Sequence, residues 1–511
     1  MNYFLNESVF TLNSGTEFSA IKRLQLFKKN GQPAKILTRN YNSNSAADIE
    51  RVGLESSDVL NMYDYFQEVT DQPRVNADVR YIDVFDKNLY HIEAVDANES
   101  MIKFHGRVIA KVSIAPATVG LVGTIDWYND NKVVVARDVW DRRGFKSSTQ
   151  YYHPDGSLGP QVFFNAQGQP KIELTHMNIN GVLAPTSWKL LDYSDKVLRF
   201  NTEEDLFAFF ASELAAKEPS SFICDRPTLT SAMLKIENAA GKWQFLHNTH
   251  AADNRQAGAS RKLVPYLEPL FNNWVDQIDG LIVPTNQQRE EILRYYKFKR
   301  VLVLPDTYAE NVENASVQLS QAREQTIICL GMISANKGSV EAVDILARVR
   351  EKMPNVKLEF YGYASPMDYR QAIEKRAEAL NSKEFVTFPG YKSEHELAKI
   401  LEKGGVLLST SEGEAFGMGI LKGMSYGLPV VAYKVKYGLT EMIKNGKDGN
   451  LVPFRSEQAA AEAILKILSN PEIQAAYSKA AYERAQYFNA ERAWQLWEEA
   501  GQQVNNLLVK A

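Results

Sequence analysis

The hydrophobic residues follow two periods along much of the chain, and this pattern predicts an α/β protein. Residues 3–10 read as a strand, 13–17 as a tight loop and 18–29 as a helix with its apolar residues on one face. Short apolar runs typical of buried strands recur at 34–38, 222–225, 243–247, 281–284, 301–304, 326–330, 357–361 and 386–388. Helical spacing predicts helices at 59–68, 263–277, 287–296, 457–468, 471–487 and 490–509.

Between residues 80 and 200 the pattern changes to many short strands separated by turn residues. The turn signals stand at 129–131, 154–156, 166–168 and 178–181, and the runs between them alternate polar and apolar residues. An antiparallel β-meander inserted into the first α/β part is the simplest interpretation. Its aromatic residues either line a binding surface or only pack one side of the meander; they are Trp127, Trp140, Tyr151, Tyr152, Phe163 and Phe164.

Composition narrows the class of protein without choosing a function. The 511 residues are 45% hydrophobic and 23% charged, which is ordinary for a globular chain with two or three domains. A net charge of -4 argues against nucleic acid as the main partner. Cys224 and Cys329 stand in apolar runs, which suits thiols in a reducing compartment. The N-terminus resembles no export signal, and no run of about 18 apolar residues occurs, so we expect a cytoplasmic protein with at most peripheral membrane association.

The stretch from 404 to 433 carries the strongest chemical signal. It predicts a strand at 406–408, a polar turn at 409–413, a helix from 416 that closes at 427–429, and a second strand at 430–431. A helix N-terminus beside a Gly-rich loop, at the carboxyl end of a parallel strand, suits an anion such as a nucleotide diphosphate.

This stretch resembles the C-terminal motif of family 4 glycosyltransferases of the GT-B fold. These retaining enzymes carry a Glu, a Phe-Gly segment and a second Glu eight positions after the first. Glu414 and Ala415-Phe416-Gly417 match the first half, but the second Glu position holds Lys422.

A resemblance over nearly the whole chain is to bacterial enzymes that glycosylate serine-rich or serine-aspartate repeat proteins, and more distantly to wall teichoic acid glycosyltransferases. It is carried by the segments at 61–68 and 137–144, by the β-meander, by the pair His247 and His250, and by Tyr437-Gly438. It implies a GT-B fold with two Rossmann-like lobes. We assign 1–79 and 201–315 to the first lobe, 80–200 to the meander that would bind acceptor or partner, 316–488 to the second lobe and 489–511 to a helix that crosses back. The polar segment 309–324 has the composition of a linker between the lobes.

The resemblance also implies a site for a UDP-sugar donor, with no metal and no other cofactor. The family neutralises the diphosphate with an Arg and a Lys, and these positions hold Met332 and Lys337 here. Met offers neither charge nor a bidentate fork, and Lys422 can donate to a ribose oxygen but cannot accept from a ribose hydroxyl. If the chain is active, Glu414 and His250 are its expected catalytic residues. The expected donor-binding residues are Gly15, Thr16, Lys337, Phe416, Gly417 and Lys422.

Each of these residues also has an ordinary structural interpretation. Gly15 could be part of a common strand-to-helix turn, Glu414 a solvated carboxylate, Lys422 a surface lysine and His250 a hydrogen-bonded histidine at a strand end. Three functions stay open: a non-catalytic subunit that stabilises a paralogous catalytic transferase and helps bind a serine-rich acceptor; a transferase that uses UDP-N-acetylglucosamine or UDP-glucose on protein or teichoic acid; and a lectin-like module. The donor-site replacements favour the first.

Overall fold

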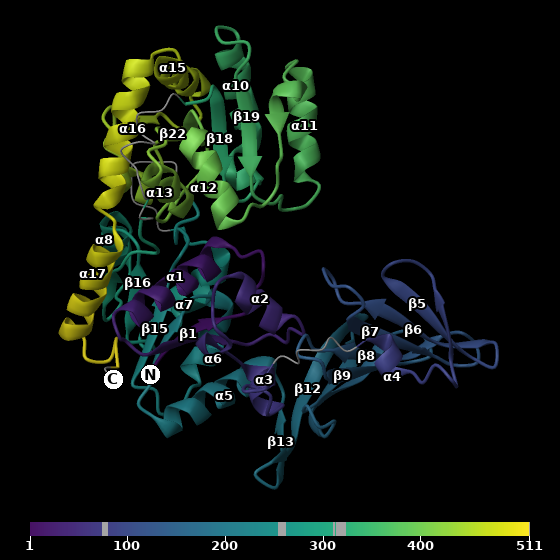
Figure 1. Ribbon diagram of the computed structural model, residues 1–511. Helices are drawn as coiled ribbons and strands as arrows, with labels where there is room; N and C mark the ends of the chain where they lie inside the picture. The colour runs from purple at the N-terminus through teal and green to yellow at the C-terminus, as the bar shows by residue number, and fades with distance from the viewer. Residues whose placement is uncertain (74–79, 254–261, 310–311, 313–322, 510–511) are drawn as a thin grey trace. The chain divides into compact units, whose positions relative to one another are not determined.

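The computed structural model describes residues 1–73, 80–253, 262–309, 312 and 323–509. The chain forms two compact units. Unit 1 comprises Met1–Asn13, Pro33–Gly241 and Val509–Ala511, and unit 2 comprises Ser14–Gln32 and Lys242–Leu508. Figure 1 shows the elements of both units coloured by position in the chain.

Unit 1 contains four strands of a parallel sheet, in the order β14-β1-β2-β3. Their bounds are β1 Asn2–Asn6, β2 Ala34–Thr38, β3 Val59–Asn61 and β14 Ser221–Cys224. Strand β1 is buried along its whole length, as expected for a central parallel strand. The helices of this unit are α2 Ser45–Arg51, α3 Met62–Phe66, α4 Tyr81–Val84, α5 Glu203–Lys217 and α6 Thr230–Leu234.

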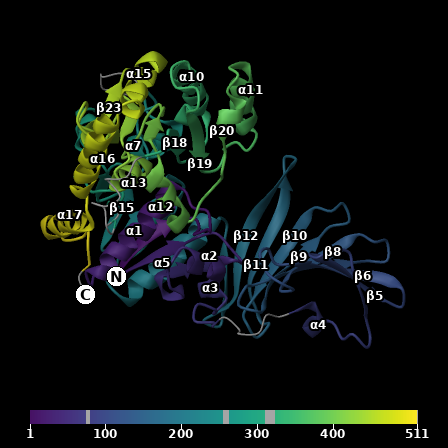
Figure 2. The ribbon, with the colours of Figure 1, turned by 45° about the horizontal axis from the view of Figure 1, so that its top comes forward.

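The rest of unit 1 is a ten-stranded antiparallel sheet whose strands follow one another in chain order. They are β4 His91–Ala94, β5 Glu99–Phe104, β6 Arg107–Ile114, β7 Val122–Tyr128, β8 Val134–Trp140, β9 Lys146–Tyr152, β10 Leu158–Phe164, β11 Pro170–Ile179, β12 Val182–Tyr193 and β13 Lys196–Phe200. Figure 2 shows the strands from β12 to β8 side by side. All four predicted turns fall between paired strands, so the predicted β-meander is confirmed.

A buried ion-pair cluster joins this sheet to α3. The Arg143 guanidinium contacts Asp141 at 2.7 Å and Asp64 at 2.8 Å, and it also donates to the Val69 carbonyl at 2.8 Å. Burial raises the pKa of Asp64 to about 6 despite the neighbouring Arg143. The segment 137–144 therefore connects the antiparallel sheet to α3 through Arg143.

Unit 2 contains three paired parallel strands and a six-stranded parallel sheet. The three strands are β15 Gly241–Phe245, β16 Gly280–Val283 and β17 Val301–Val303. The six-stranded sheet has the order β20-β19-β18-β21-β22-β23. Its bounds are β18 Thr326–Leu330, β19 Lys357–Tyr361, β20 Val386–Thr387, β21 Val406–Ser409, β22 Val430–Tyr433 and β23 Gly449–Val452.

Helices cover the sheets of unit 2. They are α1 Gly15–Lys29, α7 Glu268–Asn272, α8 Asn286–Tyr295, α10 Ser339–Arg350, α11 Tyr369–Ala379, α12 Glu394–Lys403, α13 Met418–Ser425, α14 Gly438–Met442, α15 Glu457–Leu468, α16 Pro471–Gln486 and α17 Ala490–Gln503. In Figure 1, α10 lies beside α11 and near β19. Strands β18, β21 and β22 are apolar and almost completely buried at the centre of the core, as in Ile327, Leu407 and Val430.

The strand order confirms an α/β fold with two parallel sheets and an inserted antiparallel sheet. Two predicted elements were wrong in detail. Residues 59–61 form β3 rather than the start of a helix, and Asn61 then caps α3 by accepting from the Tyr63 and Asp64 amides. The predicted helix over 263–277 is reduced to α7, which follows a single 3-10 turn at Pro265–Leu267.

Smaller differences concern element ends and the linker. The first strand ends at Asn6 and the last helix at Gln503, earlier than predicted. Most of the predicted linker, 310–311 and 313–322, lies outside the described residues. Within the described part of the chain, no helix combines the length and the apolar character needed to cross a membrane.

Candidate functional site

The candidate site lies where two loops leave neighbouring strands of the six-stranded sheet. From β18 the chain runs first to β19 and β20 on one side, then returns to β21, β22 and β23 on the other. The carboxyl ends of β18 and β21 therefore flank the point where the strand order reverses, which is where open α/β sheets bind ligands. Lys337 follows β18, and Glu414 follows β21.

Hydrogen bonds join these two loops directly. The Thr410 hydroxyl contacts the carbonyls of Lys337 and Gly338 at 2.9 and 2.8 Å, and the Glu412 amide donates to the Asn336 carbonyl at 2.9 Å. Gly338 has a φ of +61°, and a Cβ there would lie 2.3 Å from the Thr410 carbonyl oxygen. Glycine is thus required at the point where the loops meet.

Lys337 and Glu414 contact each other across this junction. The Lys337 ammonium lies 2.5 Å from Glu414 Oε1, and the Ser411 hydroxyl donates to the same oxygen at 2.8 Å. The side chains retain 32% and 17% of their exposure, so solvent screens the pair only in part. The retained cation of the site is therefore already compensated by the retained carboxylate.

Met332 and Lys422, which stand where the family has Arg and Glu, lie in different surroundings. Met332 is half-buried in the loop after β18 and brings no charge. Lys422 lies in the last turn of α13 and forms an ion pair with Glu394, the first residue of α12. Its ammonium is thus also matched by a carboxylate.

The loop after β22 is attached to the site through the Glu414 backbone. The Glu414 amide donates to the Lys436 carbonyl at 2.8 Å, and the Glu414 carbonyl accepts from the amides of Tyr437 at 2.6 Å and Gly438 at 2.9 Å. A Cβ on Gly438 would lie 1.9 Å from the Phe416 carbonyl oxygen, so only glycine fits there. This close approach fixes where the Tyr437 side chain leaves the backbone.

His250 lies next to this loop, in a buried and mostly aromatic environment. Its side chain has no exposed surface, and its ring is stacked with the ring of Phe271 and with that of Tyr437, at centroid distances of 5.9 and 5.6 Å. The Tyr437 hydroxyl is 3.4 Å from His250 Nδ1. Burial lowers the His250 pKa to about 4, which keeps the imidazole neutral at pH 7.

A buried ion pair stands beside His250. Lys436 Nζ lies 2.9 and 3.2 Å from the two carboxylate oxygens of Glu291 in α8, and the two side chains are only 4% and 6% exposed. Neither residue belongs to the matched motif. His247, the other histidine of the pair, contacts Asp306 at 2.6 Å.

Of the other predicted site residues, Gly15, Thr16 and Gly417 lie at the site, and Phe416 lies in the core. Gly15 begins α1, and a Cβ there would lie 3.6 Å from the Met418 sulfur at the start of α13, so Gly15 reaches the site while Thr16 is buried beside it. Gly417 is the N-cap of α13 with a φ of +96°. Phe416 instead packs in the core against Phe488, with ring centroids 6.2 Å apart.

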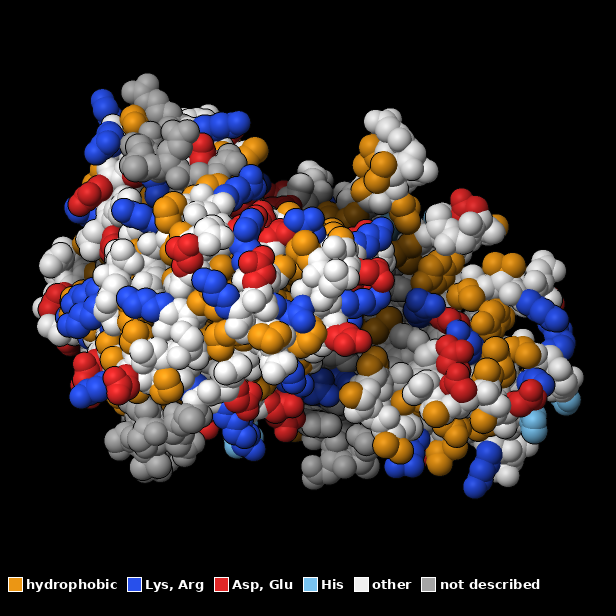
Figure 3. All heavy atoms as spheres, turned by 90° about the horizontal axis from the view of Figure 1, so that it is seen from above, with side chains coloured by type: hydrophobic (Ala, Val, Ile, Leu, Met, Phe, Trp, Pro, Cys, Tyr) orange, Lys and Arg blue, Asp and Glu red, His pale blue; other side chains and the backbone are white. Residues whose placement is uncertain are grey.

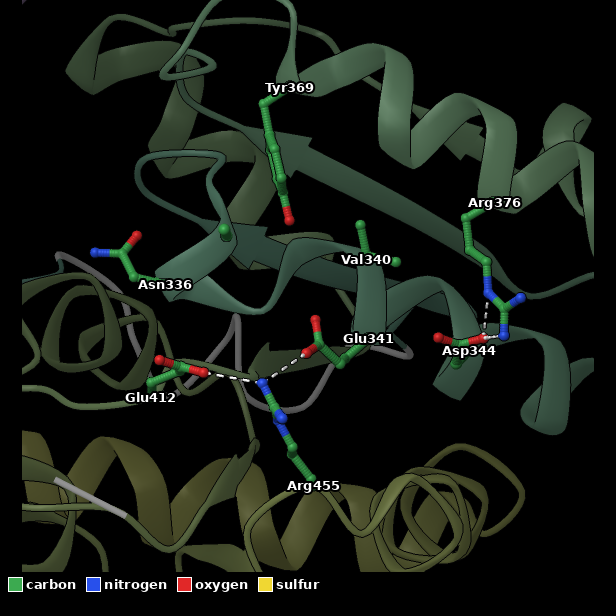
Figure 4. A pocket seen from close by; sticks show the side chains of 9 residues that line it. Asn336, Val340, Glu341, Asp344, Tyr369, Arg376, Glu412 and Arg455 are labelled. Atoms are coloured by element: carbon green, nitrogen blue, oxygen red, sulfur yellow. Dashed lines mark hydrogen bonds and ion pairs between the residues drawn. The ribbon is translucent and has the colours of Figure 1, made fainter. Parts of the chain in front are cut away.

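A cavity of about 740 Å³ opens beside the same two loops. Figure 4 shows Tyr369 directed into it, with Arg455 beside Glu412 and Glu341, and Arg376 beside Asp344. Each of the two guanidinium groups is thus matched by carboxylates. Within the described residues, no group of three or more His, Cys, Asp or Glu side chains is arranged to hold a metal ion.

The aromatic residues of the meander do not act as one surface. Phe163 is buried against Tyr41 and Tyr63, and Trp127 packs on Phe85, whereas Tyr151 is 44% exposed. Figure 3 shows hydrophobic side chains gathered over the antiparallel sheet, at the right of the view. Exposed apolar residues of this sheet include Val135, Met177, Ile179, Val182, Leu183 and Val197.

Sequence comparison identifies the class of protein that the fold and site define. Residues 311–484 match the family Glycosyl transferases group 1, and residues 10–242 match a family of accessory Sec system proteins. The chain therefore has a GT-B fold and is related to glycosyltransferases of family 4.

Particular relatives cover almost the whole chain. The poly(ribitol-phosphate) alpha-N-acetylglucosaminyltransferase of Staphylococcus aureus is 24% identical over 94% of this chain and 96% of its own length. The GtfA subunit of the UDP-N-acetylglucosamine–peptide N-acetylglucosaminyltransferase of Streptococcus agalactiae is 22% identical over 88% of this chain and 87% of its own.

Two solved structures show the same fold. The pneumococcal O-GlcNAc transferase GtfA in complex with UDP and GlcNAc superposes with a TM-score of 0.84 at 19% identity, covering 99% of each chain. A crystal structure of accessory secretory proteins 1, 2 and 3 of Streptococcus pneumoniae gives 0.68 at 15% identity, covering 99% of this chain and 100% of that one.

Proposed function

We propose that the chain is a subunit of a protein O-glycosylation complex that assists glycosyl transfer without performing it. Its partner would be a paralogous catalytic transferase that uses UDP-N-acetylglucosamine, and its acceptor a serine-rich protein. The observation that carries this proposal is the direct contact between Lys337 and Glu414, in a site whose other cation position holds Met332.

The charges of the site explain why transfer would be slow. A departing nucleoside diphosphate must be neutralised, and Lys337 is shared with Glu414 while Lys422 is shared with Glu394. Loss of one preorganised charge-stabilising contact raises a barrier by about 3 kcal/mol, or roughly a hundredfold in rate. Met332 cannot make one such contact. The ion pairs of Lys337 and Lys422 weaken the charge stabilisation that these two lysines could give to the diphosphate.

The comparisons support a heteromeric role. The match to the accessory Sec system protein family covers residues 10–242, and one chain in the crystal structure of accessory secretory proteins 1, 2 and 3 has the same fold. The relative from Streptococcus agalactiae is itself described as a subunit. A chain that keeps this scaffold and lacks donor-site groups suits a stabilising or acceptor-binding task.

A second candidate function is glycosyl transfer by this chain alone. It is favoured by the presence of Glu414, Lys337 and His250, and by similarity to transferases that act on peptide and on poly(ribitol-phosphate). In this case a UDP-sugar would serve as donor substrate, and neighbouring groups would compensate for Met332 and Lys422.

Turnover assays separate the two functions. UDP release from UDP-N-acetylglucosamine and UDP-glucose is measured in three samples. They are the purified chain alone, a paralogous transferase alone, and the two proteins co-expressed and purified together. The proposal predicts little turnover alone, a stable complex and raised activity of the partner. Substantial turnover by the isolated chain that Glu414→Gln abolishes would instead establish the transferase.

A further inference from the structure

The cavity shown in Figure 4 is a second candidate binding site. It is lined by residues of α10 and α11 and of the loops after β18, β21 and β23, all of which belong to unit 2. Among the described residues that line it, none is one of the residues expected to bind the donor. A ligand in this cavity would therefore be recognised by a different set of side chains from a ligand at Lys337 and Glu414.

The charged side chains that line the cavity carry both signs and contact each other. The Arg455 guanidinium lies 3.0 Å from Glu412 and 3.8 Å from Glu341. The Arg376 guanidinium donates to Asp344 at 2.7 Å. An anionic ligand would be repelled by the carboxylates, and a cationic ligand would be repelled by the guanidinium groups. The lining therefore favours a ligand without net charge.

A polyhydroxyl compound is the uncharged ligand that matches both kinds of group. A hydroxyl can donate to a carboxylate, which only accepts, and can accept from a guanidinium, which only donates. The half-buried Tyr369 points into the cavity, where its ring can pack against the C–H face of a sugar ring. The volume of about 740 Å³ lies within the range of about 300–1,000 Å³ that is typical of ligand sites.

A buried hydroxyl close to these charges has no hydrogen-bond partner. Tyr433, the last residue of β22, is 1% exposed, and its hydroxyl oxygen is unpartnered among the described residues. Burial and the carboxylates of Glu341 and Glu457 raise the pKa of Tyr433, so its hydroxyl stays protonated at pH 7. An unpaired buried donor costs free energy, and it indicates that a water or a ligand oxygen supplies the acceptor.

We propose that this cavity binds an uncharged sugar residue, with the Tyr369 ring against the sugar and with Glu341, Glu412 and Arg455 on its hydroxyls. The chemical class is a pyranose without phosphate, because the carboxylates would repel the diphosphate of a sugar nucleotide. The site thus suits a sugar that has already been transferred to an acceptor. The choice of a serine-rich protein as that acceptor rests on the proposed function, whereas the class of ligand rests on the cavity alone.

Saturation-transfer difference NMR on the full chain tests the site, because it detects weak binding of small sugars. The probes are the methyl glycosides of N-acetylglucosamine and of glucose, and we expect at least one of them to bind. Tyr369→Ala should raise its Kd by about tenfold, because it removes the stacking surface, whereas Tyr369→Phe should stay within about threefold of the wild type.

Tyr151→Ala is the matched control, because Tyr151 is an exposed tyrosine of the antiparallel sheet. It should bind the glycoside as the wild-type chain does. A wild-type chain that binds neither glycoside would overturn the proposal. Binding that Tyr151→Ala weakens and Tyr369→Ala leaves unchanged would also overturn it, because the sugar would then lie on the antiparallel sheet.

Competing probes test the location of the sugar and the class of ligand. Excess UDP should not displace the glycoside, and displacement would assign the sugar to the donor site and contradict the proposal. Inorganic phosphate and N-acetyl-lysine amide represent anionic and cationic ligands. Tighter binding of either one than of the glycosides would contradict a site for an uncharged ligand.

A serine-rich peptide with and without N-acetylglucosamine on its serines tests the source of the sugar. We expect the glycosylated peptide to bind more tightly, and Tyr369→Ala to abolish the difference. Equal binding of the two peptides would overturn the assignment to a transferred sugar. Failure of the proposed function would instead be seen as turnover by the isolated chain, which leaves the binding of the methyl glycosides unaffected.

Discussion

Replacing Glu414 by Gln should increase the affinity of the chain for UDP. In the wild-type structure the Lys337 ammonium lies 2.5 Å from the Glu414 carboxylate, which therefore competes with any phosphate for the same cation. Gln keeps the size and can still accept from the Ser411 hydroxyl, but it carries no charge. The substitution thus releases Lys337 and removes a negative charge that repels the diphosphate.

The size of the gain follows from Coulomb's law with solvent screening. Two like charges about 5 Å apart repel by about 3 kcal/mol at an effective dielectric constant of about 20. Lys337 keeps 32% of its side-chain exposure, so part of this energy is screened. We expect a gain of about 1–2 kcal/mol, or roughly fivefold to thirtyfold in Kd.

Isothermal titration calorimetry with UDP at low and high salt measures the effect. The gain should shrink as ionic strength rises, because screening weakens the interaction of partly exposed charges. Lys337→Met with Glu414→Gln is the matched control and should lose the gain. An unchanged or lower UDP affinity in Glu414→Gln would refute the reasoning that the ion pair suppresses nucleotide binding.

Three further predictions concern the surroundings of the site. Lys436→Met should lower the free energy of unfolding by about 3–5 kcal/mol in urea titrations, because it strands the buried Glu291 carboxylate. The wild-type chain should lose stability below pH 6.5, by up to about 1.4 kcal/mol per pH unit, because the His250 pKa is lowered from 6.5 to about 4 and the unfolded chain takes up the proton first. Gly438→Ala should destabilise unit 2 by roughly 1–3 kcal/mol or more in thermal unfolding, because its Cβ would lie 1.9 Å from the Phe416 carbonyl oxygen.

Each of these has a control. Lys436→Met combined with Glu291→Leu should recover most of the lost stability, and a double variant as unstable as the single one would contradict the ion-pair argument. His250→Gln should show a weaker loss of stability between pH 6.5 and 4; an identical pH profile would assign the loss to other groups. Gly15→Ala, whose Cβ meets its nearest neighbour at 3.6 Å, should cost less than Gly438→Ala, and equal losses would count against the steric explanation.

Much of the fold could be predicted because its elements have strong local signals. The buried parallel strands are short apolar runs, and 326–330 and 357–361 agree with the structure to the residue. The turns of the meander carry Gly, Asn and Asp at the positions that hairpins require. Residues 59–61 were misassigned because Asn61 both ends a strand and caps the next helix, so a strand and a helix follow each other without a turn signal.

The candidate site also contains some residues that the sequence could predict and others that it could not. Lys337 and Glu414 could be found from the sequence because they match motif positions of the family that the chain resembles, in the loops after two recognisable strands. The pair of Lys436 and Glu291 could not, because the two residues are 145 positions apart and no local pattern relates them. The contact between Lys337 and Glu414 was also not predicted, since spacing places residues near a site but does not show whether they pair with each other.

Turnover of UDP-N-acetylglucosamine by the purified chain, measured with and without a paralogous transferase, tests the central claim most directly. If the paired charges of the site leave the chain unable to stabilise a departing diphosphate, the isolated chain will release little UDP and will raise the activity of its partner. Efficient glycosyl transfer by the isolated chain, abolished by Glu414→Gln, would contradict the claim.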